Sequence, residues 1–146
     1  MIRLGGGRRD RGSAAIEVAI LMPLFLAFFT TAVVLGRTAN AISAVEAAAY
    51  DAARTASIAR DAGTAQTRAS ATVWESLSDH GVACVDGPIV EVNTSGFGTP
   101  VGNPASVSVT VTCRVTFVDI DLVGVPADQA ISASFVSPID QYRTRQ

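Results

Sequence analysis

The feature that most constrains this chain is an apolar run near its N-terminus. Residues 18–36 are nineteen consecutive positions without Asp, Glu, Lys or Arg. As a helix the run is roughly 28 Å long, close to the roughly 30 Å hydrocarbon thickness of a bilayer. Pro23 lies inside it and frees the carbonyl of Ala19, which membrane helices tolerate when another group satisfies that carbonyl. The run therefore predicts one membrane-spanning helix.

The charges around the run predict its orientation. Residues 1–12 carry four arginines and one aspartate, a net side-chain charge of +3, whereas residues 13–146 carry seven arginines and twelve acids, a net of −5. Positively charged flanks stay in the cytoplasm. We expect a single-pass protein of the cytoplasmic membrane with its N-terminus in the cytoplasm and its C-terminal part outside. A secretory signal cleaved after Ala41 explains the same features and stays open.

The residues beyond Arg37 are patterned to continue the helix. Small apolar side chains recur at steps of three and four residues, forming an alanine stripe of Ile42, Val45, Ala49, Ala52, Ala56 and Ala59. A second apolar group of Val73, Trp74 and Leu77 follows, and Gly81 is typical of a helix end. We expect one long helix over residues 13–80, with a bend or break between 61 and 72. The alanine stripe can face the protein's own sheet or another subunit.

The pattern changes to a period of two after Gly81. Apolar and polar residues alternate from Val107 to Phe117, again at Ile131, Ala133 and Phe135, and briefly around Glu91. Turn-rich stretches at 93–104 and 119–129 separate these segments. We predict a three-stranded antiparallel meander, which needs a cover over its apolar face. The helix supplies it, with Val73, Trp74 and Leu77 on the valines, and the fold class is α+β.

The chain has two cysteines, Cys84 and Cys113, both in the part predicted to lie outside the cell. That compartment favours a disulfide. The bridge would close a loop of roughly 30 residues and stabilise a small sheet by about 3 to 4 kcal/mol. Two unpaired apolar cysteines are the alternative.

The sequence gives little sign of catalytic chemistry. His80 is the only histidine and lies beside Asp79 at a helix end. No Cys/His cluster has zinc spacing, Gly5–Gly7 lacks the lysine of a phosphate-binding loop, and no basic patch suggests nucleic acid. We expect no enzyme, no cofactor, no metal and no nucleic-acid partner.

A carboxylate at the edge of the apolar run requires an explanation. Glu17 is four residues after Ser13, whereas a capping box with Ser13 as the N-cap needs its acid at position 16, which is Ile16. Compensation of the helix dipole favours an acid in the first turn, yet it does not explain the basic residues and the Gly12–Ser13 step before it.

These residues resemble a type IV prepilin signal, which has a basic leader, a glycine at the cleaved bond and glutamate at mature position five. The stretch RGSAAIEVAILMPLFL is similar to the TadE-like pseudopilins of the tight-adherence (Flp) pilus system. EAAAYDAARTASIAR fits the alanine- and arginine-rich helix that follows the membrane in that family, and ISASFVSPIDQYR resembles the ending of its actinobacterial members.

The resemblance implies a type IV pilin-like fold and a role for three residues. A membrane aspartic prepilin peptidase would cleave between Gly12 and Ser13, and Glu17 would pair with the new amine of a neighbouring subunit. Val18 stands where main filament pilins tend to have an aromatic residue, and 134 residues would remain after cleavage. Both departures favour an accessory pseudopilin, with other pilins and pilus platform proteins as partners in a hetero-oligomer.

We therefore predict four segments: a basic leader at 1–12, a transmembrane and assembly helix at 13–36, an amphipathic helix at 37–80 and a small β domain with its tail at 81–146. Two other hypotheses stay open. One is a secreted, disulfide-bonded binding module released after Ala41, and the other is an envelope protein whose signal anchor is never cleaved.

Overall fold

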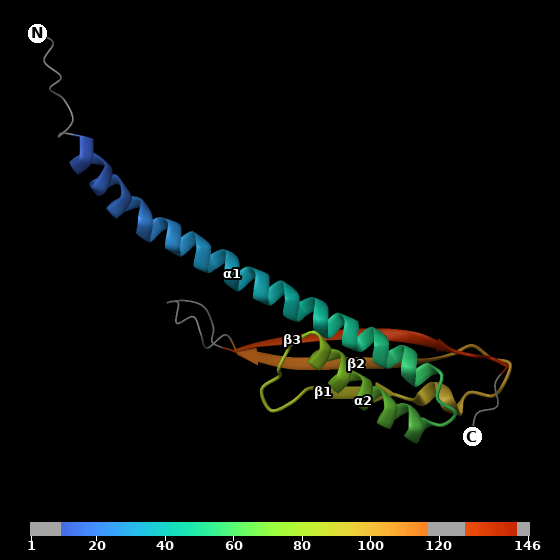
Figure 1. Ribbon diagram of the computed structural model, residues 1–146. Helices are drawn as coiled ribbons and strands as arrows, with labels where there is room; N and C mark the ends of the chain where they lie inside the picture. The colour runs from blue at the N-terminus through green and yellow to red at the C-terminus, as the bar shows by residue number, and fades with distance from the viewer. Residues whose placement is uncertain (1–9, 117–127, 143–146) are drawn as a thin grey trace, which may run out of the picture. The chain divides into compact units, whose positions relative to one another are not determined.

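The computed structural model describes residues 10–116 and 128–142. Most of the predicted leader, residues 119–127 of the predicted 119–129 turn and the last residues of the tail lie outside this range, and residues 128 and 129 of that turn belong to a strand. The element order is α1 (Asp10–Ser57), α2 (Ala62–Asp79), β1 (Ile89–Asn93), the 3-10 helix η1 (Ser95–Gly98), β2 (Ala105–Thr116) and β3 (Asp128–Ile139) (Figure 1). The chain divides into two compact units, residues 1–37 and 38–146, and each is described by itself.

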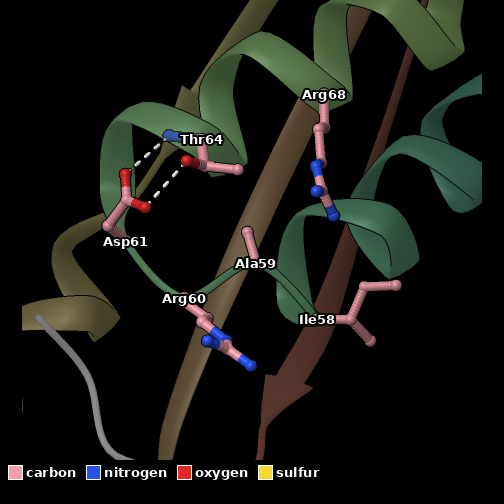
Figure 2. Close-up of a pocket in the computed structure, with 6 residues that line it drawn as sticks. All are labelled: Ile58, Ala59, Arg60, Asp61, Thr64 and Arg68. Atoms are coloured by element: carbon pink, nitrogen blue, oxygen red, sulfur yellow. Dashed lines mark hydrogen bonds between the residues drawn. The ribbon is translucent and has the colours of Figure 1, made fainter.

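The helix predicted over 13–80 is broken once beyond residue 37, as expected, because α1 ends at Ser57 and α2 begins at Ala62. The break lies slightly before the expected 61–72 region. Asp61 causes it by acting as the N-cap of α2 in an extended conformation. Its carboxylate accepts bonds from the Thr64 amide and hydroxyl, both at 2.7 Å (Figure 2). The amide bond, followed by the hydroxyl bond, holds the pKa of Asp61 below its usual value.

The end of α2 agrees with the sequence prediction. Gly81 has a φ of +66°, which glycine adopts without a steric penalty. Its amide donates to the Ser78 carbonyl at 2.9 Å, and the Val82 amide donates to the Leu77 carbonyl at 3.0 Å. These two bonds form a Schellman motif that ends the helix.

The sheet is the predicted antiparallel meander, with the order β1–β2–β3. On one face of β2, Val107, Val109, Val111 and Cys113 are fully buried. On the other face, the Thr110 hydroxyl bonds the Ser134 hydroxyl at 3.0 Å. This alternation places an apolar row under the helices and a polar row in solvent, so the α+β class is confirmed.

The apolar row of β2 packs against α1 and α2 in one continuous core. The helical side chains with at most 4% of their surface exposed are Ala41, Ala44, Val45, Ala48, Ala49, Ala52, Ala53, Ala56, Ala65, Ala69, Val73 and Leu77. The alanine stripe therefore lies inside the protein's own core, except for Ile42, which is 40% exposed. This answers the question that the sequence left open.

One aromatic side chain, Trp74, differs from the prediction, and another, Phe135, lies on the predicted face. Trp74 does not lie on the valine face: it is 58% exposed and its ring lies beside Gly87, where an added Cβ would be 2.9 Å from it. Phe135 does lie on the apolar side of β3, but it is 40% exposed and stacks edge-on against Tyr50, with ring centroids 4.7 Å apart. Both rings stand at the margin of the core because small alanines leave little depth for them.

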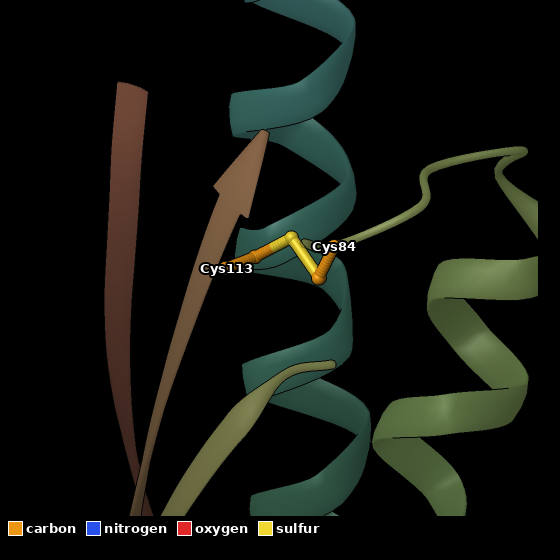
Figure 3. The surroundings of a disulfide bond; sticks show 2 residues. All are labelled: Cys84 and Cys113. Atoms are coloured by element: carbon orange, nitrogen blue, oxygen red, sulfur yellow. A yellow bond between two sulfur atoms is a disulfide. The ribbon is translucent and has the colours of Figure 1, made fainter. Parts of the chain in front are cut away.

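The structure contains the Cys84–Cys113 disulfide, with the two Cα atoms 5.2 Å apart (Figure 3). Cys113 is fully buried in the apolar row of β2, whereas Cys84 lies in the loop that follows α2. The Val85 amide donates to the Arg114 carbonyl at 2.7 Å just beside the bridge. The bridge and this bond hold the α2–β1 connection against the sheet.

We expect removal of the disulfide to destabilise the 38–146 unit. A bridge with a sequence separation of 29 stabilises the folded state by about 3 to 4 kcal/mol in the chain-entropy model. The paired substitutions Cys84→Ala and Cys113→Ala should lower the urea midpoint, followed by the fluorescence of Trp74, the single tryptophan. A reductant should lower the midpoint of the wild-type chain and leave that of the variant unchanged. Equal midpoints for the oxidised and reduced wild-type chain would contradict this prediction.

The backbone of η1 also lies close to the backbone of β2. A Cβ added at Gly96 would collide with the carbonyl oxygen of Ser106, whereas one at Gly98 would meet nothing within 4 Å. Gly96→Ala should therefore destabilise the protein by about 1 to 3 kcal/mol, because backbone must move to relieve the overlap. Gly98→Ala is the matched control in the same short helix. Urea unfolding of both variants decides the prediction, which fails if the two have the same midpoint.

Candidate functional site

The unit of residues 1–37 consists, where it is described, of the first part of α1. Its large apolar side chains are exposed, for example Leu24 at 68%, Phe25 at 72% and Phe28 at 72%. α1 is long and apolar enough to cross a membrane. Exposure of such a surface to water is unfavourable, whereas contact with lipid or with another apolar helix is favourable. A single apolar N-terminal helix of this kind fits membrane anchoring.

The threonine hydroxyls of the apolar helix donate to backbone carbonyls of the same helix. Thr30 donates its hydroxyl to the Leu26 carbonyl at 2.9 Å, and Thr31 donates to the Ala27 carbonyl at 2.8 Å. Pro23 lies within α1 and does not end it. These internal bonds let the hydroxyl groups enter hydrocarbon without an unsatisfied donor.

The predicted processing and assembly residues lie at the start of α1. Gly12 and Ser13 belong to its first turn by backbone conformation. Glu17 follows four residues after Ser13, so both positions lie on the same side of the helix. The Glu17 side chain is exposed, and no hydrogen bond or ion pair reaches it from the part of the chain whose side chains are described. The Glu17 carboxylate is therefore exposed beside an apolar helix.

The histidine considered for catalysis bonds to a carbonyl of the preceding helix. His80 is exposed after the end of α2, and its Nδ1 donates to the Ser76 carbonyl at 2.7 Å, because a carbonyl can only accept. Within residues 10–116 and 128–142, no group of three or more His, Cys, Asp or Glu side chains is placed to hold a metal ion.

The structure also brings together charged residues that the sequence did not single out. Carboxylates from α1 and α2 share a groove, and arginines gather at the turn between the two helices. A sequence signal exists for the turn, because Asp61 and Thr64 have the spacing of a helix cap. No comparable signal exists for the groove, which depends on how the two helices cross.

Comparison with known protein families gives one match. The family model described as TadE-like protein matches residues 12–54. The match begins at Gly12, includes Glu17 and the apolar helix, and ends near the end of α1. No curated protein and no solved structure gives a significant match. Residues 12–54 of this chain are therefore similar to the TadE-like family.

Proposed function

We propose that this protein is an accessory pseudopilin of a tight-adherence (Flp) pilus or a related secretion system, with a structural and not an enzymatic role. The TadE-like match supports involvement in assembly of such a pilus, whose machinery is membrane-associated. The observation that carries the finer proposal is the exposed Glu17 at the start of an apolar helix, four residues after the step where the family match begins.

Cleavage between Gly12 and Ser13 by a prepilin peptidase would create a charged partner for Glu17. An unpaired carboxylate or ammonium is unfavourable at a low-dielectric boundary, so a new α-amine at Ser13 and a Glu17 carboxylate attract each other strongly there. After cleavage Ser13 would be the first residue of the same helix that carries Glu17, so subunits aligned side by side could pair amine to carboxylate. Gly12 then serves recognition and cleavage, and Glu17 guides assembly.

The rest of the chain suits such a subunit. We place residues 38–146 outside the cytoplasmic membrane, where an oxidising compartment suits the Cys84–Cys113 bridge. The N-terminus is cytoplasmic, and other pilins, pseudopilins and platform proteins are the partners in a hetero-oligomer. Release after Ala41 is less favoured, because Ala41 is 4% exposed and belongs to the core of the 38–146 unit. A cut there would lie inside α1.

The N-terminus of the mature protein tests processing. In cells with the native prepilin peptidase, intact mass and peptide sequencing should find a chain that begins at Ser13 and retains the apolar helix. Gly12→Leu should abolish this cut, because the scissile position would carry a branched side chain. Gly36→Leu is the control, since an added side chain at Gly36 meets nothing within 4 Å. A mature start at Ile42, or a chain that keeps Met1, would overturn the proposal.

Substitution of Glu17 tests assembly separately from cleavage. Glu17→Gln should leave the Ser13 start and membrane retention unchanged, because it removes only the charge. Recovery of the protein with the assembled pilus machinery should fall about tenfold or more, which corresponds to loss of roughly 1.4 kcal/mol. Glu46→Gln, on the exposed side of the same helix, is the matched control. Equal recovery of the two variants would remove Glu17 from the assembly role.

A further inference from the structure

A groove between α1 and α2 gathers negative charge on the 38–146 unit. We call it the acidic groove for its carboxylates, Asp51 on α1 and Glu75 and Asp79 on α2, all three exposed. The other lining residues are Arg54, Thr55, Thr72, Ser76 and His80. Three carboxylates thus face a single arginine. The C-terminal turn of α2 has no basic residue, so the partial negative charge of that helix end adds to the field.

A buried hydroxyl in the acidic groove lacks a partner. Ser76 is 8% exposed, and its Oγ has no hydrogen-bond partner among the residues that the structure describes. Buried polar groups in proteins are almost always hydrogen-bonded. An N–H donor that entered the groove would pair with the carboxylates that lie beside this oxygen. The groove therefore has the chemistry of a site for a cationic side chain.

The same chain presents matching cations elsewhere. Arg60 and Arg68, which we call the basic corner, flank the turn between α1 and α2 and are both exposed. Figure 2 shows Arg60 pointing outward from the turn and Arg68 extending from α2. Asp61 lies between them, accepts the amide and hydroxyl of Thr64 and interacts electrostatically with Arg68, so the two arginines outnumber the one carboxylate. Each guanidinium carries five donors in a planar fork that fits carboxylates.

We propose that the acidic groove of one copy binds the basic corner of a second copy. The two surfaces differ, so the contact is head-to-tail and can repeat along a row of copies without closing on itself. Exposed ion pairs are individually weak and are screened by salt. The contact is therefore salt-sensitive and acts between copies that a membrane already holds close together. The contact does not require cleavage at Gly12, so it can be tested independently of the proposed function.

The absence of lysine from the chain makes a sharp test possible, because a carbodiimide joins carboxylates only to amines. The full-length Arg68→Lys chain keeps its charge and gains one side-chain amine. It is reconstituted in liposomes as a mixture of ¹⁵N-labelled and unlabelled copies and then treated with the carbodiimide. Mass spectrometry should find mixed-isotope peptides that join Lys at 68 to Glu75, Asp79 or Asp51. Links from the N-terminal amine to Glu17 are separate peptides and do not affect this readout.

The controls decide whether the groove is responsible. Arg114→Lys places the amine on an exposed position of β2 and should give at least fivefold less crosslinked dimer. Adding Glu75→Gln and Asp79→Asn to Arg68→Lys should cause a similar loss, as should 0.5 M NaCl. Because these positions are exposed, the variants should keep the urea midpoint of the parent chain. Links confined to one copy, or equal dimer yield from the Arg114→Lys chain, would overturn the proposal.

Discussion

The 38–146 unit depends on close contact between the valine row of β2 and the alanines of two helices. Val107, Val109 and Val111 are fully buried, and so are Ala48, Ala52 and Ala65. Alanine brings a helix backbone near to its neighbours, but each side chain removes little apolar surface from water. A core built this way gains less from burial per residue than one built from leucine. The Cys84–Cys113 bridge and the two helix caps supply stabilisation that such a shallow core lacks.

The composition of α1 changes at the boundary between the two units. Before Arg37 its apolar side chains are large and exposed, whereas from Ala41 onward the buried ones are mostly alanine. Large apolar side chains suit hydrocarbon, which needs no shape complementarity, and small ones suit a tightly packed protein interface. One continuous helix therefore meets two different environments. An ionisable side chain on the apolar part of the helix, such as Glu17, is costly in hydrocarbon. Its presence therefore points to a function other than packing.

Much of the fold could be predicted from local patterns, and the limits of those patterns are specific. Alternation over residues 107–117 identified β2, and Gly81 identified the end of α2, because both depend on backbone geometry within a few residues. The break predicted between 61 and 72 lies slightly earlier in the structure, because Asp61 caps α2 and ends the connection. Trp74 was misplaced because hydrophobicity alone does not say which large side chain an alanine-rich core can accommodate.

The sequence by itself determined the apolar span and the strand periodicity, and it predicts the processing step, the role of Glu17 and a compartment that favours a disulfide. Each of these depends on composition or on spacing along the chain. Only the tertiary structure decided that the alanine stripe faces the protein's own sheet, that Tyr50 meets Phe135, and that Asp51 shares a groove with Glu75 and Asp79. The physical reason is that periodicity defines a face of one element, whereas the partner of that face depends on how whole elements cross and pack.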